Sequence, residues 1–277
     1  MPPARSYQCA NRRSLRARAT SESHRAGAFP IHATIYLILL IVFLATLVRS
    51  AFGFGEALIA VPLLAFCMPV RVAAPLAVLV SITIAAVVVV QDWRHIHARS
   101  AGWLVLSTLF GIPLGLLLLM HSPEHLIKAG LGGLILLFAL FCLFGNMRLQ
   151  LHHDSWTWLL TCGFFAGVLG GAYGMNGPPL VIYGSLRNWT AQHFRATLQA
   201  YFLPASVLGM WGYWSTGLWT TVVTHDYLIS LPVLLPAVFL GRVINHRLSS
   251  AAFSRYIYGG LAAIGLALLA QSLVHGH

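Results

Sequence analysis

Eight runs of apolar residues, each close to bilayer-spanning length, dominate this 277-residue chain. A helix needs about 20 predominantly apolar residues to cross the hydrocarbon core of a membrane. Within that core only helices and closed barrels satisfy their own backbone N–H and C=O groups, so such runs predict transmembrane helices. The expected fold class is therefore all-α, a polytopic transmembrane helical bundle of about eight spans. The runs lie at 33–48, 72–91, 101–120, 126–145, 156–170, 196–214, 227–241 and 256–274.

Composition places the chain in a membrane rather than in water. Hydrophobic residues make up 58% of the sequence and charged residues 8%, whereas roughly a quarter of a soluble domain is charged. The net charge of +11 would suit a nucleic acid, but six of the seventeen basic residues lie in the first 30 positions and the others are scattered at the ends of the apolar runs. This distribution is typical of loop and headgroup charges. No basic stripe remains to follow a phosphate backbone, so nucleic-acid binding is excluded.

Residues 1–30 form a basic segment before the first apolar run. The segment is rich in Arg and Ser, has Glu22 as its one acidic residue and lacks the apolar core of a secretory signal. We interpret it as a disordered cytoplasmic tail or as the product of a start codon assigned too early, with an organellar transit peptide as a weaker alternative. The arginines of the later loops do not agree on one orientation, so the orientation of the chain in the membrane is left open.

The sequence carries no metal, cofactor or catalytic signature. Its four cysteines form no C-x-x-C pair, and three of them lie inside apolar runs, where a free cysteine behaves as a small hydrophobe. The histidine clusters lie at the ends of runs, with too few ligands at the right spacing for a zinc site. G-x-S-x-G, H-E-x-x-H and P-loop patterns are absent. We therefore expect no enzyme activity, no cofactor and no metal.

A glycine-rich interruption of an apolar run occurs twice, at residues 50–61 and 171–182. A shift of 121 positions places Gly53 on Gly174, and farther along the chain a shift of 127 aligns two Gly-Gly pairs. Loops absorb the few inserted residues that this difference requires. The simplest explanation is an internal duplication, although any two apolar stretches share some composition.

The duplication divides the chain into two homologous membrane repeats, residues 31–147 and 152–274. If the pieces on either side of each interruption form one crossing, each repeat has four crossings. If they form two, each repeat has five, and the two repeats are inverted relative to each other. The charge pattern does not decide between these alternatives.

Each interruption predicts a broken helix that lines a solute site. Irregular backbone in the hydrocarbon core survives only where it is buried in protein or lines a polar cavity. Pro178 predicts the start of a half-helix because its missing N–H would be unsatisfied there anyway, and the alignment places a matching start near Glu56 or Ala57. Two helix N-termini directed at a common region favour an anion. The alternative is that the glycines only allow close packing of transmembrane helices.

Glu56 is the acidic residue of the first interruption, and a carboxylate inside the membrane is a functional hypothesis by default. One hypothesis is that Glu56 carries a coupling proton. The other is that it is a residue at a helix start, stabilised by the positive end of the helix dipole.

Two arginines flank the interruptions. Arg49 precedes the first and Arg195 follows the second, and each either neutralises an anion or reaches to the membrane interface. Asn176, Tyr173 and Gln199 are candidate uncharged donors, and Gln199 needs a partner because its amide lies inside an apolar run. The predicted substrate-binding residues are Arg49, Gly53, Gly55, Glu56, Gly174, Asn176, Gly177 and Arg195.

From about residue 31 to 274 the chain resembles the TauE/SafE family of bacterial membrane proteins. The resemblance rests on a glycine-rich stretch followed by a proline-containing apolar run in each half, 53–64 and 170–180, and on a closing helix with a Gly-Gly pair. It implies a multi-pass transporter of the inner (plasma) membrane that moves small anions such as sulfite, sulfonates and other organosulfur acids. The chain departs from the usual glycine-rich pattern at Glu56 and Asn176.

We therefore predict a transporter of a small anion, sulfur-containing or carboxylic, that works by alternating access at a site between the two interruptions. The alternative is a non-transporting membrane protein that scaffolds a neighbouring enzyme. The expected partners are a small anionic solute and the lipid bilayer, and homo-oligomerisation is left open.

Overall fold

The structure is a computed structural model that describes residues 31–92, 98–144, 156–186, 191–247 and 250–274. The chain divides into two units, Met1–Leu37 and Ile38–His277. All that follows concerns the second unit. The described residues form helices and turns and contain no strand, which confirms the all-α prediction.

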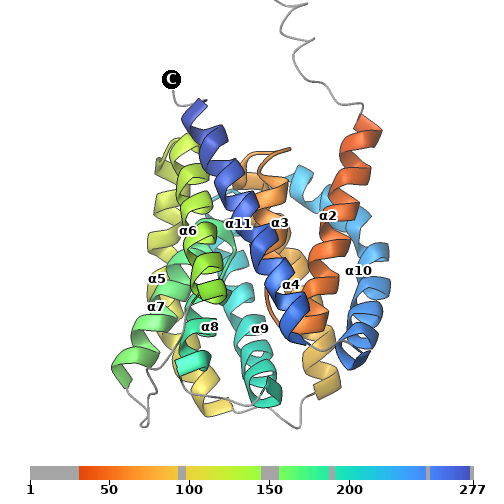
Figure 1. Cartoon of the computed structure of the whole chain (residues 1–277). Helices are drawn as coiled ribbons and strands as arrows, with labels where there is room; N and C mark the ends of the chain where they lie inside the picture. The colour runs from red at the N-terminus through yellow and green to blue at the C-terminus, as the bar shows by residue number, and fades with distance from the viewer. Residues whose placement is uncertain (1–30, 93–97, 145–155, 187–190, 248–249, 275–277) are drawn as a thin grey trace, which may run out of the picture. The chain divides into compact units, whose positions relative to one another are not determined.

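The helices follow the order long, short, long, long, long, and the same order then recurs (Figure 1). Each short helix comes directly after one of the glycine-rich interruptions, as expected from the sequence. The helices are α2 (Ile31–Phe52), α3 (Glu56–Leu64), α4 (Val70–Asp92), α5 (Ala98–His121), α6 (Glu124–Phe144), α7 (Trp156–Tyr173), α8 (Gly177–Leu186), α9 (Ala191–Ser215), α10 (Thr221–Arg247) and α11 (Ser250–Val274).

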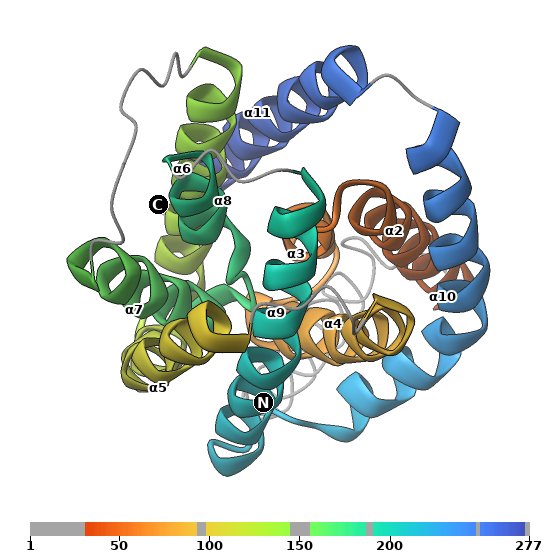
Figure 2. The same cartoon turned by 90° about the horizontal axis from the view of Figure 1, so that it is seen from below.

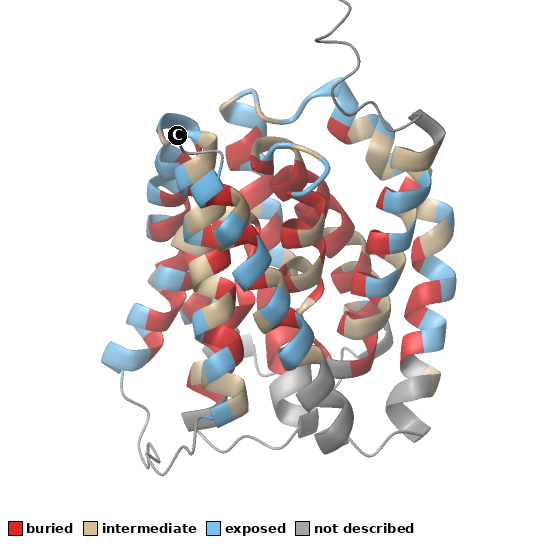
Figure 3. Cartoon of the chain, turned by 45° about the horizontal axis from the view of Figure 1, so that its top comes forward, coloured by how far each residue is buried: buried red, intermediate tan, exposed pale blue. Residues whose placement is uncertain are grey.

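Six of the described helices are long and apolar enough to cross a membrane: α2, α4, α5, α6, α10 and α11. The sequence predicted eight spans, and the two that do not qualify are α7 and α9. Helix α7 is interrupted by glycines, and α9 carries polar side chains such as Gln199. Large apolar side chains such as Phe110, Leu137 and Phe239 are exposed (Figure 3), as expected of helices that face lipid.

Helix α4 is the most enclosed of the six candidate spans. Within its most apolar stretch 67% of the residues are buried, against 28% in α10 and 22% in α11. Seen from below, α3, α4 and α9 lie near the middle of the view, while α10 and α11 lie toward its edge (Figure 2). The short helix α3 therefore begins in the protein interior, where a polar group is shielded from lipid.

Helices α5 and α7 run parallel and pack through glycines. A methyl group on Gly111 would lie 2.1 Å from the Phe164 carbonyl oxygen, and one on Gly115 would lie 2.1 Å from that of Val168. Small residues allow this close backbone approach between transmembrane helices. The sequence alternative that glycines serve packing is therefore correct for these residues, which lie outside the two interruptions.

We expect Gly115→Ala to destabilise the protein by about 1–3 kcal/mol, because the added methyl group meets backbone that cannot rotate away. Gly133→Ala in α6 is the matched control, since a methyl group there has nothing within 4 Å. Thermal unfolding of the detergent-purified protein measures both. Equal melting temperatures for the two variants would contradict the close packing of α5 on α7.

Helices α6 and α11 pack in opposite directions. A methyl group on Gly132 would lie 2.9 Å from the Gly265 carbonyl oxygen, and the Ser272 hydroxyl donates to the His125 carbonyl over 2.7 Å. In Figure 1, α2 runs away from the end of the bundle at which α11 finishes. Because α6 opposes α11, α5 opposes α6 across a short turn, and α7 parallels α5, helix α7 runs opposite to α2.

Candidate functional site

The two interruptions meet at one pocket inside the bundle. The pocket encloses about 350 Å³ of empty space, counting its open side. Its lining comes from the end of α2, the start of α3, the middle of α4, the turn before α8 and the middle of α9. The lining residues are Arg49, Phe54, Gly55, Glu56, Ala57, Leu58, Ser81, Gly174, Met175, Asn176, Gly177, Phe202 and Ser206.

Positive backbone angles at two glycines produce the first interruption. Gly53 has φ 85° and Gly55 has φ 99°, values that side-chain-bearing residues rarely adopt. The Gly53 N–H donates to the Arg49 carbonyl over 2.6 Å and ends α2. Helix α3 begins at Glu56, and the residue before it makes no side-chain cap. The sequence prediction of a half-helix start near Glu56 is confirmed.

The second interruption is held from both sides. Gly174 has φ 67°, and a methyl group there would lie 2.9 Å from the Ala74 carbonyl oxygen of α4. The Tyr213 hydroxyl of α9 lies 2.9 Å from the Gly170 carbonyl and 3.0 Å from that of Gly171. It therefore satisfies carbonyl groups that the end of α7 leaves without a helical partner. Helix α8 begins at Gly177, one residue before the predicted start.

A buried ion pair occupies the first side of the pocket. The Arg49 guanidinium Nη1 lies 2.5 Å from Glu56 Oε2, and the two residues are 3% and 1% exposed. Removing one partner of such a pair leaves an uncompensated charge in the interior. The sequence named both residues separately but did not predict that they pair.

Helices α4 and α9 complete the polar network. Arg49 Nη1 also donates to Ser81 Oγ, and Nη2 donates to Gln199 Oε1 over 3.1 Å. The Gln199 amide donates in turn to the Gly53 carbonyl over 2.8 Å, so the predicted need of Gln199 for a partner is confirmed. The Phe202 ring centre lies 5.1 Å from the guanidinium carbon, within the range of a cation–π contact.

Three buried polar atoms of this site lack a hydrogen-bond partner: Arg49 Nε, Glu56 Oε1 and Asn176 Oδ1. Buried polar groups are normally paired, and the exceptions often mark functional positions. Asn176 is 8% exposed and directly precedes α8. The unpaired atoms belong to both interruptions, so a small polar solute bound here would meet groups from each.

Most of the predicted site residues lie together in this arrangement. Arg49, Gly55, Glu56, Gly174, Asn176 and Gly177 line the pocket, and Gly53 contributes its carbonyl to the network. Arg195 lies in α9, but its side chain is outside the described part of the chain. Tyr173 is not among the lining residues, since its hydroxyl lies 2.6 Å from where a methyl group on Gly130 of α6 would be.

Sequence reasoning missed Ser81, Phe202 and Ser206. Each is buried in a long helix and faces the pocket. A polar residue in the apolar run of α4 could have drawn attention to Ser81. A phenylalanine in an apolar helix carries no such signal.

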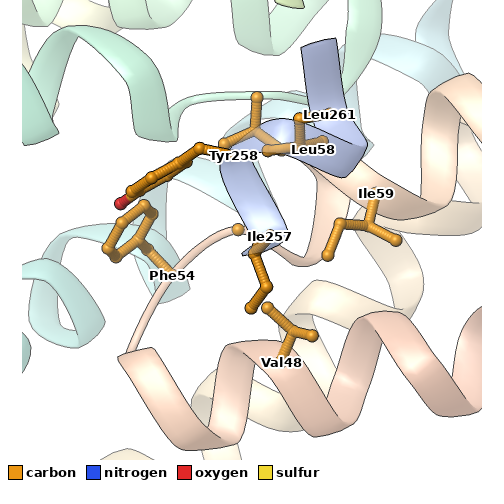
Figure 4. Close-up of a pocket in the computed structure, with 8 residues that line it drawn as sticks. Val48, Phe54, Leu58, Ile59, Ile257, Tyr258 and Leu261 are labelled. Atoms are coloured by element: carbon orange, nitrogen blue, oxygen red, sulfur yellow. The ribbon is translucent and has the colours of Figure 1, made fainter. Parts of the chain in front are cut away.

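An apolar pocket of about 300 Å³ adjoins the polar one and shares Phe54, Gly55 and Leu58 with it. Its other lining residues come from α2, α3 and α11. In Figure 4 the rings of Phe54 and Tyr258 lie on one side, and Val48 and Ile59 lie on the other. A polar site and an apolar one therefore meet at the first interruption.

Comparison with known proteins relates most of the chain to one family. The sequence pattern of the family described as "Sulfite exporter TauE/SafE" matches residues 38–268. The probable sulfite/organosulfonate exporter TauE of Cupriavidus necator is 25% identical over 228 residues, which cover 81% of this chain and 88% of that protein. No solved structure matches the chain.

Proposed function

Because this chain belongs to the TauE/SafE sulfite exporter family, whose members are transporters and not enzymes, we propose that it carries a small anion across the plasma membrane. The proposed solutes are sulfite, sulfonates and related organosulfur or carboxylic acids. The single observation that carries the proposal is that both interruptions line one pocket with a buried arginine. A guanidinium binds a carboxylate or a sulfur oxyanion by charge-assisted hydrogen bonds.

The starts of the two half-helices support an anion as the solute. Helix α3 begins at Glu56 and α8 at Gly177, and both residues line the pocket. The first N–H groups of a helix have no partner within the helix and carry a partial positive charge. Arg49 and two helix starts therefore contribute positive potential to one place, against the single negative charge of Glu56.

We further propose that the chain consists of two inverted repeats, residues 31–147 and 152–274. The recurring order of five helices supports this division. The opposite directions of α2 and α7, which begin the two repeats, support five passes per repeat rather than four. Inverted repeats with discontinuous helices at their interface are the arrangement in which many transporters alternate access to a central site.

Reconstitution into liposomes tests the proposed function. We expect saturable uptake of at least one of sulfite, methanesulfonate, butanesulfonate and acetate under an imposed ion or pH gradient, with counter-transport from the trans side. Counter-transport separates a carrier from a channel. Absence of movement of every anion under every gradient would contradict the proposal and leave the scaffold alternative.

The apolar pocket beside the site supports an organic anion within this class. An anion held by Arg49 would extend its tail past Phe54 and Leu58 into the apolar pocket. Each buried methylene contributes about 0.8 kcal/mol, or about fourfold in affinity. We therefore expect affinity to rise from methanesulfonate to butanesulfonate.

Ile257→Trp should remove this dependence on chain length, because the larger side chain fills the pocket. Leu266→Trp is the matched control, since Leu266 is also in α11 but is 56% exposed. Competition of alkanesulfonates of increasing length against a labelled solute measures the effect. The same chain-length dependence in Ile257→Trp as in the unaltered protein would show that the tail lies elsewhere.

A further inference from the structure

We propose that the Glu56 carboxylate is a tethered occupant of the anion site, which a substrate replaces on Arg49 only when Glu56 takes up a proton. This inference rests on the proposed transport function and concerns how the same site is regulated. It follows from the geometry of the ion pair and from the charge that the pocket holds.

The Glu56 side chain occupies the guanidinium group that a substrate needs. Nη1 of Arg49 is shared between Glu56 and Ser81, and Nη2 donates to Gln199. A substrate oxyanion in the pocket would lie beside an ionised carboxylate, and two negative groups at that distance cannot both stay charged in the interior. Protonation of Glu56 removes the repulsion and weakens its hold on Nη1.

Glu56 does not serve as a helix cap, which was the alternative hypothesis for its role. The start of α3 has no side-chain cap, and the carboxylate turns toward Arg49 of α2. Gly177 begins α8 at the equivalent position without any carboxylate. A half-helix of this kind therefore forms without an acidic residue at its start, and Glu56 is free for another role.

Arg49 is the charged group that faces Glu56 among the described residues. From α4 and α9 the neighbouring groups are the uncharged Ser81 and Gln199, and from the turn before α8 the uncharged Asn176. Tyr258 of α11 is titratable and lines the adjoining apolar pocket. The charged pair of α6, Glu124 and Lys128, lies at the other end of α3, where Glu124 accepts from the Val70 N–H.

The charge of the site follows from these neighbours. Without substrate, Arg49 and Glu56 neutralise each other. With a bound monoanion and an ionised Glu56, the buried site would carry one net negative charge. With a bound monoanion and a proton on Glu56 Oε2, the site is neutral again, so one proton accompanies each monovalent anion. The proton comes from the water on the side from which the anion enters, and it leaves with the anion.

Isothermal titration calorimetry with methanesulfonate tests this coupling directly. This probe stays fully ionised across the working pH range, so any proton taken up belongs to the protein. Titrations of the full chain in nanodiscs, in buffers with different ionisation enthalpies, measure the protons bound per anion. We expect about one proton per anion and a tenfold loss of affinity per pH unit above the pH at which free Glu56 titrates.

Glu56→Gln should bind methanesulfonate with about zero proton uptake and with an affinity that does not change with pH. Glutamine keeps the size of the side chain and an oxygen acceptor for Arg49 but carries no charge. Asp226→Asn is the matched control, because Asp226 contacts His225 away from the pocket, and it should retain about one proton per anion.

Proton uptake near zero in the unaltered protein, or uptake near one in Glu56→Gln, would overturn the inference. Both results still leave anion transport possible, since binding and flux would persist. Complete absence of methanesulfonate binding together with absence of flux for every anion would instead contradict the proposed function. If Glu56→Gln does not fold, the proton count of the unaltered protein decides alone.

Discussion

Replacing Arg49 with glutamine is expected to abolish saturable anion uptake and to destabilise the protein by about 3–5 kcal/mol. The loss of uptake follows because Arg49 is the cation that lines the pocket in the described part of the chain. The loss of stability follows because Glu56 would keep a buried charge without a partner. Liposome uptake and thermal unfolding in detergent measure the two effects separately.

The double variant Arg49→Gln/Glu56→Gln separates a defect in transport from a defect in folding. It removes both charges at once, so no uncompensated charge remains and most of the lost stability should return. Uptake should stay absent because the anion still lacks a cation. Lys128→Gln is the control, since its pair with Glu124 lies at the other end of α3. Near-normal uptake by the double variant would place the anion elsewhere.

Gly174→Ala should also eliminate uptake, because the second interruption requires glycine for two reasons. Its φ of 67° disfavours a side chain, which costs about 1–2 kcal/mol. In addition, the new methyl group would lie 2.9 Å from both the Ala74 carbonyl oxygen and the Val78 side chain. Helix α4 would then have to move away from the pocket that it lines.

Gly217→Ala is a matched control for the backbone conformation alone. Gly217 has φ 73°, similar to that of Gly174, but a methyl group there has nothing within 4 Å. We expect this variant to lose a little stability and to keep its uptake. If the two variants lose stability and uptake equally, the contact of Gly174 with α4 is not what makes glycine necessary.

The interruptions and the half-helix starts were predictable because their signals are local. Gly53, Gly55 and Gly174 all adopt positive φ, and a proline in the first turn marks the start of α8. The number of spans was less predictable, since α7 and α9 carry glycines and polar side chains that serve the protein interior. Their composition therefore reads as weakly apolar although they pack within the bundle.

The partners within the site were not predictable from local signals. Arg49 and Glu56 are seven residues apart, and whether they meet depends on the turn that the two glycines between them adopt. The contact of Arg49 with Gln199 joins residues 150 positions apart. Such contacts depend on how α4 and α9 pack, which no single run of the sequence specifies.

The polar pocket also indicates which stage of a transport cycle the structure represents. Its innermost space, about 20 Å³, takes about one water molecule, which is less than a sulfonate group needs. The described conformation is therefore occluded and empty of cargo, with the ion pair closed on itself. Loading must separate the half-helix starts from α4 or α9, so the opening motion, rather than contact between anion and arginine, should limit the rate of each cycle.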